Sequence, residues 1–508
     1  MQSYNQNRQM NNKNKLHIKL RSWVRASERS LNASCYAWLA LSAGFSQTIY
    51  NMIQLRSNQV EPIEKAISFF QEKKPKPSLI VLPTAWGKSI LTAFVAKNTN
   101  DKMIVLQPSK ELLEQNYLKY VNLCDGFANA GIYSASFGSK EIAQITYATI
   151  GSIKTLGAKF KALGFTKMLI DEAHLFPREA DSMLGTFLKE SGITHVLGIT
   201  ATPVKLQTGR DQFGQNYSKL VMLTSRSKKG NFFKDIIHVG QVSEMVRLGF
   251  WSPLTYEASQ FDDSQLVFNS SKSEYTEDSV QRAFEDNGGT QTIVNALDAH
   301  PERQHILAFA PSVQDAISLS ERYPNSAVIY GDMDKRERAS IIERFRKGEI
   351  RVIFNVRVLS TGFDYTGIDC IVLGVSTASI ALYYQIIGRA TRIDPQKKDA
   401  LIVDLGGNVQ RFGRVEDLTF EKGRMWRLFG SGGRLLSGIP IAEIGQYTRE
   451  DTQVIDAQAA QPIVIMPFGK YKGEKISNIP LDYRKWMIRA FEWNSRNVKL
   501  KKSIMATL

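Results

Sequence analysis

Short apolar runs, separated by amphipathic stretches, are the feature that most restricts how this chain can fold. Between residues 55 and 202, four such runs occur at 79–82, 103–106, 168–170 and 196–199. Runs of this length that are apolar throughout are typical of parallel strands buried on both faces, with helices between them. This part of the chain is therefore predicted to be a doubly wound α/β domain.

The same rhythm returns after residue 305, which predicts a second parallel sheet. The fold class is therefore α/β, with two doubly wound parallel-sheet lobes in tandem. The second set of runs lies at 306–309, 327–330, 352–354, 371–373 and 401–403.

The remaining segments differ in composition and suggest the domain boundaries. The N-terminal extension is basic, begins with an Asn- and Gln-rich stretch that we expect to be disordered, and continues into one or two helices. We expect the extension at 1–50, the lobes at 51–225 and 226–415, a polar and acidic insert near 260–300, a glycine-containing linker at 416–461 and a small C-terminal module at 462–508.

The net charge of the 508-residue chain is +16, and its pI is near 9.5. An excess of that size favours a polyanionic partner such as a nucleic acid. No run of about 18 apolar residues is present, so we expect no membrane span. The N-terminus does not have the pattern of a secretory signal, and the three cysteines are far apart. We therefore expect a reducing, cytoplasmic location.

A candidate phosphate-binding loop follows the first apolar run. Residues 83–89 read Pro-Thr-Ala-Trp-Gly-Lys-Ser and precede an apolar, helix-like stretch. Gly87 would let the backbone approach the phosphates closely, and backbone N–H groups at the helix start would bind them. Lys88 would reach the β and γ phosphates, and the Ser89 hydroxyl would ligate Mg²⁺.

The loop departs from the GxxxxGK[ST] pattern. Leu82 stands at the first glycine position, and Ala85 stands where many such loops have another glycine. Trp86 is expected to pack over the nucleotide, with a place in the core as the alternative. These departures could reshape the loop and lower its affinity for nucleotide.

An acidic pair follows the third apolar run, at a strand end that faces the ligand crevice of an open α/β sheet. Asp171 is suited to contact Mg²⁺, and Glu172 is suited to act as the base that orients an attacking water. The alternative is a solvated acidic turn. The phosphate loop upstream favours the catalytic interpretation.

Two arginines near residue 390 carry a further signal. Guanidinium groups are permanently charged and grip phosphate oxygens, so Arg389 and Arg392 are candidate arginine fingers. Their spacing of three predicts that they share one helical face. A solvated basic helix end is the alternative.

Several motifs occur together in the order of a known family. The loop at 83–89, the Asp-Glu-Ala-His box at 171–174, Thr-Ala-Thr at 200–202 and the segments 359–364 and 385–392 resemble motifs of superfamily 2 helicases of the DEAH/DExH type. The resemblance covers about residues 51–415 and implies two RecA-like lobes that bind ATP and Mg²⁺ between them.

The resemblance also implies a role for each matching residue. Gln59 would read adenine, and Asp364 would approach the nucleotide from the second lobe. Phosphates and metal would be held by Thr84, Gly87, Lys88, Ser89 and Asp171. The catalytic groups would be Glu172, Gln385, Arg389 and Arg392. His174, Thr200 and Thr202 would couple the state of the nucleotide to the binding of the nucleic-acid strand.

Nucleic-acid contacts are expected along the lobe faces. Hydroxyls, backbone N–H groups and lysine contact phosphate and sugar rather than base edges, so little sequence specificity is expected. The candidates are Ser109, Lys110, Thr149 and Thr361.

The flanking segments favour DNA as the track. Residues 244–254 and 404–409 resemble phage and bacterial relatives that include translocases such as UvsW and the helicase subunits of restriction enzymes. The module from residue 462 resembles one found after some exonuclease domains, including exonuclease X. Its interleaved lysines and aromatics suit a nucleic-acid strand, with a small aromatic core and a basic rim as the alternative.

The sequence therefore predicts an ATP-dependent DNA helicase or translocase that uses Mg-ATP and acts as a monomer in a bacterial or phage-infected cell. Two alternatives stay open. One is an RNA helicase of the same superfamily. The other is a nucleic-acid-binding ATPase switch or scaffold that does not unwind its substrate.

Overall fold

The computed structural model describes residues 55–124, 128–176, 182–210, 216–224, 232–270, 274–356, 358–360, 365–452, 465–491, 498–505 and 507. The chain divides into a unit at 1–57 and a unit at 58–508, and the second unit carries both lobes. The expected N-terminal extension at 1–50 lies outside the described residues. No helix in the described part is long and apolar enough to cross a membrane.

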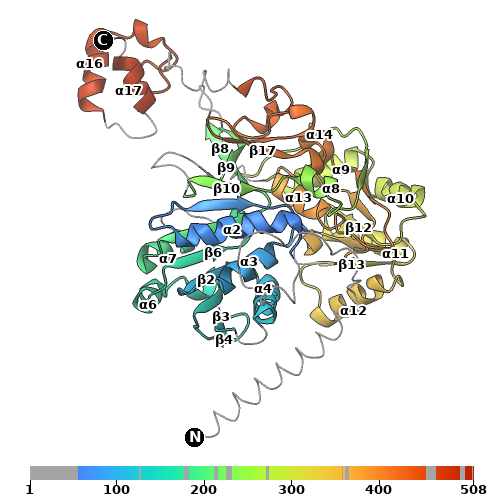
Figure 1. The fold of residues 1–508 in the computed structure, drawn as a ribbon. Helices are drawn as coiled ribbons and strands as arrows, with labels where there is room; N and C mark the ends of the chain where they lie inside the picture. Colours follow the sequence, from blue (N-terminus) through green and yellow to red (C-terminus); the bar gives the residue numbers. More distant parts are fainter. Residues whose placement is uncertain are drawn as a thin grey trace. The chain divides into compact units, whose positions relative to one another are not determined.

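Lobe 1 is built on an eight-stranded sheet in the order β10-β1-β7-β6-β2-β5-β3-β4 (Figure 1). All neighbouring strands pair in parallel except β3 and β4. Four of these strands coincide with the predicted apolar runs. The bounds are β1 Ser78–Val81, β2 Met103–Gln107, β3 Ala130–Ser134, β4 Ser139–Lys140, β5 Ile145–Thr149, β6 Lys167–Ile170, β7 His195–Thr200 and β10 Asp235–Val239.

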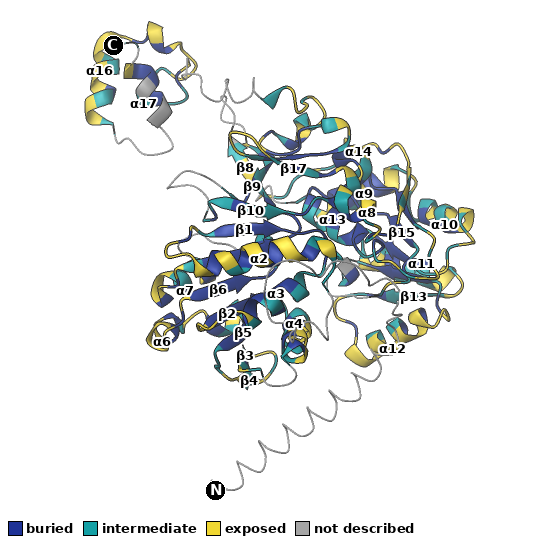
Figure 2. Ribbon diagram, viewed as in Figure 1, coloured by how far each residue is buried: buried dark blue, intermediate teal, exposed yellow. Residues whose placement is uncertain are grey.

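Helices pack against this sheet, and the exposed side of α2 contrasts with the buried strands in Figure 2. Their ends follow from local chemistry. Ser109 caps α4 by accepting a hydrogen bond from the Leu112 N–H at 3.3 Å, and Gly192 ends α7 in a left-handed conformation. The helices are α2 Ser57–Gln71, α3 Lys88–Lys97, α4 Lys110–Leu123, α5 Ile150–Ile153, α6 Gly157–Ala162 and α7 Met183–Ser191.

The observed boundary between the lobes lies C-terminal to residue 225, where we expected it. The strand β10 lies beyond the expected boundary, yet it pairs in parallel with β1 of lobe 1. Ahead of it, β8 (Val204–Arg210) and β9 (Asn216–Met222) form an antiparallel hairpin. The helix α8 (Val242–Arg247) then leads into lobe 2. The apolar pattern did not reveal β10, because this edge strand is only partly buried.

Lobe 2 has a six-stranded sheet, parallel throughout, in the order β11-β16-β15-β12-β14-β13. Five of its strands match the predicted runs. The bounds are β11 Leu254–Ala258, β12 Ile306–Phe309, β13 Ser326–Ile329, β14 Val352–Asn355, β15 Cys370–Leu373, β16 Ala400–Asp404, α9 Glu277–Asp286, α10 Gly289–Ala299, α11 Val313–Arg322, α12 Lys335–Arg346, α13 Ile380–Ile387 and α14 Asn408–Phe412.

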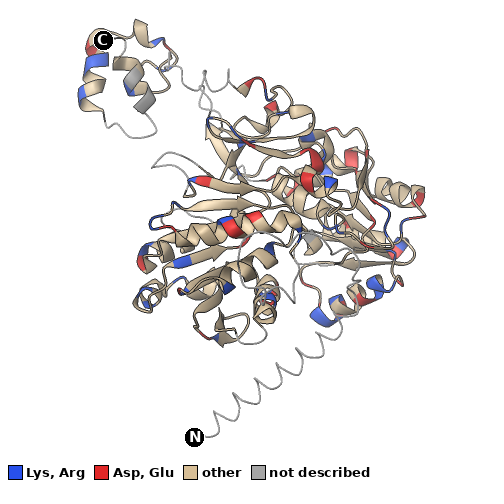
Figure 3. Cartoon of the chain, viewed as in Figure 1, with Lys and Arg blue, Asp and Glu red and all other residues tan. Residues whose placement is uncertain are grey.

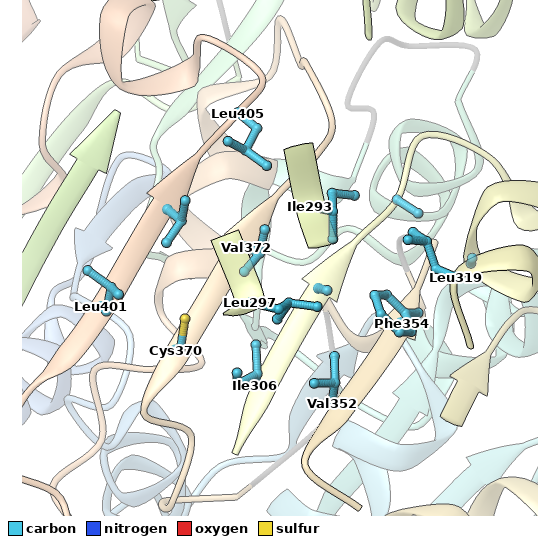
Figure 4. Packing of buried hydrophobic residues seen from close by; sticks show 14 of the residues in the cluster. Ile293, Leu297, Ile306, Leu319, Val352, Phe354, Cys370, Val372, Leu401 and Leu405 are labelled. Atoms are coloured by element: carbon cyan, nitrogen blue, oxygen red, sulfur yellow. The ribbon is translucent and has the colours of Figure 1, made fainter. Parts of the chain in front are cut away.

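The core of lobe 2 lies between its sheet and the helices α10 and α11. Figure 4 shows Ile293 and Leu297 from α10 among side chains of the central strands, such as Ile306 and Val372. All four are at most 1% exposed. Helices on a parallel sheet bury strands on both faces, which is why the runs are continuously apolar. Together the two sheets confirm the predicted α/β class with two RecA-like lobes.

The segment expected to be a linker at 416–461 is folded over 416–452. It contains an antiparallel hairpin of β17 (Thr419–Lys422) and β18 (Trp426–Phe429). A small apolar cluster beneath the hairpin joins Phe429 to Leu435 and Ile439. The glycine-rich stretch that suggested a linker forms a turn next to this cluster.

This segment contacts both lobes. The Gln241 side-chain amide both donates to the Phe420 carbonyl at 2.9 Å and accepts from the Phe420 N–H at 3.2 Å. In lobe 1, Asp235 on β10 binds the Lys422 ammonium at 2.7 Å. In lobe 2, the Tyr256 hydroxyl donates to Glu416 at 2.6 Å. Residues 416–452 therefore form a brace rather than a flexible connection.

The C-terminal module has a hydrophobic cluster of its own. Its described helices are α16 (Leu481–Ala490) and α17 (Val498–Met505). The cluster draws on both helices and on the turn before them. Its buried members are Met466, Ile476, Ile479, Met487, Leu500 and Ile504.

The close packing of lobe 1 generates a stability prediction. A Cβ added at Gly198 on β7 would lie 2.6 Å from Leu79 Cδ2 and 2.8 Å from both Ala173 Cβ and Phe233 Cζ. We expect Gly198→Ala to lower the free energy of unfolding by about 1–3 kcal/mol, because well-packed cores resist added volume. The midpoint of urea unfolding measures this. Gly423→Ala is the control, since nothing lies within 4 Å of its added Cβ; equal midpoints for the two variants would contradict the prediction.

Candidate active site

The phosphate loop joins β1 to α3 and has the backbone geometry of an anion-binding turn. Gly87 is the N-cap of α3 with φ 98°, and no side chain caps the helix. Ala85 also has a positive φ, at 56°. The first N–H groups of a helix lack partners within it, so an uncapped start favours a bound anion. The positive φ at Ala85 explains why glycine is common at this position, because a Cβ is strained there.

Trp86 is buried inside lobe 1, not exposed over the loop. Its side chain is only 1% exposed, so the expectation that it packs over a nucleotide is wrong. The physical reason is that the turn directs this large ring into the apolar interior, where its burial is favourable. Gln59, which is fully buried on α2, donates to the Trp86 carbonyl at 2.8 Å and so braces the loop. Its expected adenine contact stays a prediction.

The acidic box lies directly opposite the loop. The Lys88 ammonium is 2.8 Å from Glu172 Oε1, and both side chains are mostly shielded from solvent. Glu172 has φ 46°, a left-handed conformation that is rare outside glycine. The ends of β1 and β6 therefore bring a lysine and a carboxylate from distant positions into one ion pair.

The two carboxylates have opposite pKa shifts. Burial, reinforced by the neighbouring charge of Glu172, raises the pKa of Asp171 to about 6. Burial would raise the pKa of Glu172 too, but Lys88, His174 and Arg389 hold it below its usual value. Glu172 is therefore ionised at neutral pH.

The α4 helix supplies two further side chains to this region. The amide of Asn116 donates to Asp171 Oδ2 at 2.9 Å in a buried position, and the Lys119 ammonium donates to the Ser89 hydroxyl at 2.7 Å. Sequence reasoning missed both residues. Their spacing of three within an amphipathic helix gave no chemical signal, since only the fold places α4 beside α3 and β6.

His174 joins the acidic box to the second lobe. Its Nδ1 lies 2.8 Å from the Thr200 hydroxyl and 3.5 Å from Glu172 Oε2. The Gln385 amide Nε2 of α13 lies 3.3 Å from His174 Nε2. An amide N–H can only donate, so His174 Nε2 accepts and the ring proton sits on Nδ1. The Thr200 hydroxyl also accepts from the Thr202 N–H at 3.1 Å.

The arginines follow α13 instead of continuing it. The helix ends at Ile387, and the next residues form tight turns in which the Arg389 N–H bonds Ile386 O at 3.1 Å. The expectation that Arg389 and Arg392 share a helical face is therefore wrong, because Gly388 caps the helix before them. The charge of Arg389 still acts on Glu172, whose pKa it lowers.

The loop and the arginine turn touch directly. A Cβ added at Gly388 would lie 2.7 Å from Thr84 Oγ1, so this glycine permits a close approach of the lobes. Trp251, which follows α8, donates from Nε1 to the Thr84 carbonyl at 2.9 Å and is 3% exposed. Sequence reasoning missed Trp251 as a site residue, although its Gly-Phe-Trp-Ser-Pro context marks a turn with two aromatics.

The candidate strand contacts lie on the same edge of the sheet as the acidic box. Ser109 follows β2 and Thr149 ends β5, two strands that pair in register, and Lys110 is exposed next to Ser109. Two hydroxyls also have structural partners, since Ser109 caps α4 and Thr149 lies 3.0 Å from the Ser152 hydroxyl. Thr361 and Asp364 lie outside the described residues.

The residues fit a nucleotide with a divalent cation. In the described part of the chain, no group of three or more His, Cys, Asp or Glu side chains could hold a metal by itself. Mg²⁺ is commonly bound by one or two protein oxygens together with phosphates and water, which suits Ser89 and Asp171. The uncapped start of α3 and the Lys88 ammonium provide the phosphate donors.

Known protein families match both lobes. Residues 52–205 match the family described as "Type III restriction enzyme, res subunit", and residues 289–394 match the "Helicase conserved C-terminal domain". The chain belongs to the superfamily 2 helicases. Members of this family are ATP-hydrolysing enzymes. Residues 459–492 match a third family, described as "Putative quorum-sensing-regulated virulence factor". The expected likeness to exonuclease X stays a prediction.

Individual relatives are distant. The chain is 24% identical over 404 residues to the "Putative mitochondrial ATP-dependent helicase irc3" of Schizosaccharomyces pombe, covering 75% of this chain and 62% of the relative. It is 24% identical over 383 residues to the "DNA 3'-5' translocase XPB2" of Sulfurisphaera tokodaii, covering 70% and 82%. The chain thus spans about three fifths of the length of irc3.

A solved structure shows the same fold. The Type ISP restriction-modification enzyme LlaBIII, solved bound to DNA, superposes on this chain with a TM-score of 0.51 at 16% identity. The match covers 70% of this chain and 28% of LlaBIII.

The close approach of Gly388 to Thr84 predicts that ATP hydrolysis depends on contact between the lobes. We expect Gly388→Ala to lower the ATPase turnover by about tenfold or more, because displacement by about an ångström misaligns reacting groups. Nucleotide binding should be retained, since the loop itself is unchanged. Steady-state ATPase and nucleotide-binding assays measure the two effects.

The matched control for this variant is Gly331→Ala in lobe 2, where nothing lies within 4 Å of the added Cβ. Gly331→Ala should keep wild-type turnover. If Gly388→Ala turns over as fast as this control, the lobe contact is not required for hydrolysis.

Proposed function

We propose that this protein is an ATP-dependent DNA helicase or translocase that hydrolyses Mg-ATP between its two lobes. The observation that carries the proposal is the contact of Gln385 in lobe 2 with His174 in lobe 1. His174 lies against Glu172, and Glu172 pairs with Lys88. One connected set of side chains therefore reaches from the phosphate loop to the second lobe.

In this proposal the protein's residues divide the work of phosphoryl transfer. Lys88 and the start of α3 bind phosphate oxygens, and Thr84 and Gly87 shape the loop around them. Ionised Glu172 accepts a hydrogen bond from the attacking water and orients it. Bound Mg²⁺ would neutralise charge on the β and γ phosphates, and Ser89 and Asp171 are the residues that would hold it.

The arginines make hydrolysis depend on lobe closure. Arg389 and Arg392 come from lobe 2, whereas the phosphate loop belongs to lobe 1. Guanidinium groups that stabilise charge on the transferred phosphoryl group can contribute about 10³–10⁵ in rate. Closure therefore assembles the site, and opening after hydrolysis supplies the mechanical stroke. In this proposal His174, Thr200 and Thr202 transmit the change, which is supported by the hydrogen bonds that connect them to Gln385 and to the end of β7.

DNA is the favoured track. The net charge of +16 suits a polyanion, and the candidate strand contacts at the ends of β2 and β5 lie on the edge that also carries Asp171. The names of XPB2 and of the LlaBIII structure refer to DNA, which supports DNA over RNA. We propose that the protein acts as a monomeric motor in the cytoplasm of a bacterial or phage-infected cell.

Two substitutions separate binding from catalysis. Lys88→Ala is expected to abolish ATPase activity and weaken nucleotide binding, because the ammonium contacts phosphate directly. Arg389→Ala is expected to suppress turnover by about 10³ or more while nucleotide binding is largely kept. A fluorescent nucleotide titration and a steady-state ATPase assay measure the two properties, and circular dichroism checks the fold. A folded Lys88→Ala protein with undiminished turnover would sink the proposal.

The choice of track is tested by ATPase stimulation. We expect single-stranded or duplex DNA to stimulate hydrolysis more than RNA of the same sequence, at one stated salt concentration. A strand-displacement assay on forked DNA then separates a helicase from a translocase. Stronger stimulation by RNA would favour the RNA helicase, and hydrolysis without displacement or translocation would favour the ATPase switch or scaffold.

A further inference from the structure

The C-terminal module presents a helix face that its own core does not use. On α16 the core side carries Met487, which is 2% exposed and belongs to the apolar cluster of the module. Lys485, Trp486 and Arg489 are all exposed and follow one another at spacings of one and three residues. Residues three and four apart share a helix face, so Arg489 lies on the same face as Trp486 and as Lys485, and the exposed indole has cations beside it.

The indole of Trp486 is the unusual feature of this face. Its side chain is 52% exposed, although tryptophan is highly buried on average. It continues an aromatic row, because its ring centroid is 5.3 Å from that of Tyr483, which is 4.7 Å from that of Tyr471. Both tyrosines pack against the cluster, so they fix the row while Trp486 projects from it.

The charge around this row is strongly positive. Residues 465–491 contain six basic and two acidic side chains. Figure 3 shows the basic residues of α16 in blue. The Lys470 ammonium also lies 5.4 Å from the centre of the Tyr471 ring, at the other end of the row. This placement extends the positive charge along the aromatic side chains.

One basic residue of α16 has a structural role within the module. Arg484 donates to the Ile479 carbonyl at 2.9 Å and to the Thr507 carbonyl, so it joins the two ends of the module. Among the described residues, no hydrogen bond or ion pair ties Lys485 or Arg489 to the fold. The module thus separates a structural arginine from two outward cations near an exposed indole.

We propose that this face, defined by Lys485, Trp486 and Arg489, binds single-stranded DNA as an accessory site outside the two lobes. Bases stack on exposed aromatic rings, and flanking cations pair with the phosphates on either side. Unpaired bases are required, because a base inside a duplex cannot present its face to Trp486. An acidic peptide would match the cations but leave the aromatic row without a stacking partner.

The site serves a motor by keeping the strand attached. The choice of DNA rests on the function proposed above, and the stacking itself does not. When the module holds the strand, the local concentration of DNA near the lobes rises, although the lobes themselves gain no contact with the DNA. Loss of the site should therefore weaken capture of DNA and leave the hydrolytic cycle itself intact.

The test uses the full chain and a fluorescent oligo-dT strand, without nucleotide. We expect Trp486→Ala to weaken binding by about tenfold, in line with the loss of one stacked base. Lys485→Ala/Arg489→Ala should also weaken binding and reduce the magnitude of its salt slope by about 1.4, because two phosphate contacts to a single strand are lost. Fluorescence anisotropy over a range of salt concentrations measures both effects.

The matched control is Leu481→Ala on the same helix. Leu481 is 43% exposed and apolar but not aromatic, so its removal should leave oligo-dT binding unchanged. If Trp486→Ala binds oligo-dT as tightly as Leu481→Ala does, the proposal is overturned. It is also overturned if Trp486→Ala loses binding to anionic lipid vesicles or to an acidic peptide while DNA binding stays the same, or if oligo-rU binds the face more tightly than oligo-dT.

The ATPase assay separates this inference from the motor function. In DNA-stimulated hydrolysis, Trp486→Ala should raise the DNA concentration needed for half-maximal stimulation by about tenfold and keep the turnover at saturating DNA. A fall in saturating turnover instead would place Trp486 in the hydrolytic cycle and contradict an accessory site. If no nucleic acid stimulates the wild-type protein, the motor function fails, whereas the nucleotide-free comparison still decides whether α16 binds DNA.

Discussion

The buried pairing of Lys88 with Glu172 is the interaction on which the candidate site depends. A charge is costly to remove from water unless an opposite charge meets it, so each side chain holds the other in place. Glu172 stays ionised because the positive charges of Lys88 and Arg389 outweigh its burial. At the neighbouring Asp171, burial and the negative charge of Glu172 outweigh the charge of Lys88, and the pKa rises to about 6. Two adjacent carboxylates thus acquire different protonation behaviour from their surroundings alone, as two groups with different roles require.

The architecture explains why this ion pair forms where it does. In a parallel sheet all strands end at one edge, so the loop after β1, the acidic box after β6 and the Thr-Ala-Thr segment after β7 meet there. Lobe 2 contributes Gln385, Gly388 and Arg389 from a single helix end. The absence of a side chain at Gly388 lets that helix end approach Thr84. Trp251 and the brace at 416–452 add contacts between the same two lobes, so their separation is constrained at several points.

The parts outside the lobes divide into structural and recognition elements. The brace binds Asp235 and Tyr256 through side chains and Gln241 through the Phe420 backbone, which is typical of a structural connection. The C-terminal module instead keeps Trp486 and two cations outward while its core closes without them. A small domain gains stability from burying aromatic surface, so an exposed indole beside cations is better explained by recognition than by folding.

The sequence by itself determined the fold class and the order of the motifs. Nine predicted strands coincide with observed ones. Strands that are covered on both faces are apolar throughout, so they can be recognised from the local sequence. The motif residues Lys88, Glu172 and Gln385 could be named because their chemistry is local. Only the tertiary structure decided what depends on neighbours distant in sequence: β10 as a strand of lobe 1, the brace in place of a linker, Trp86 in the core, and Asn116 and Trp251 at the site. Those features arise from packing and hydrogen bonds across about 30 to 190 residues, and no local pattern records them.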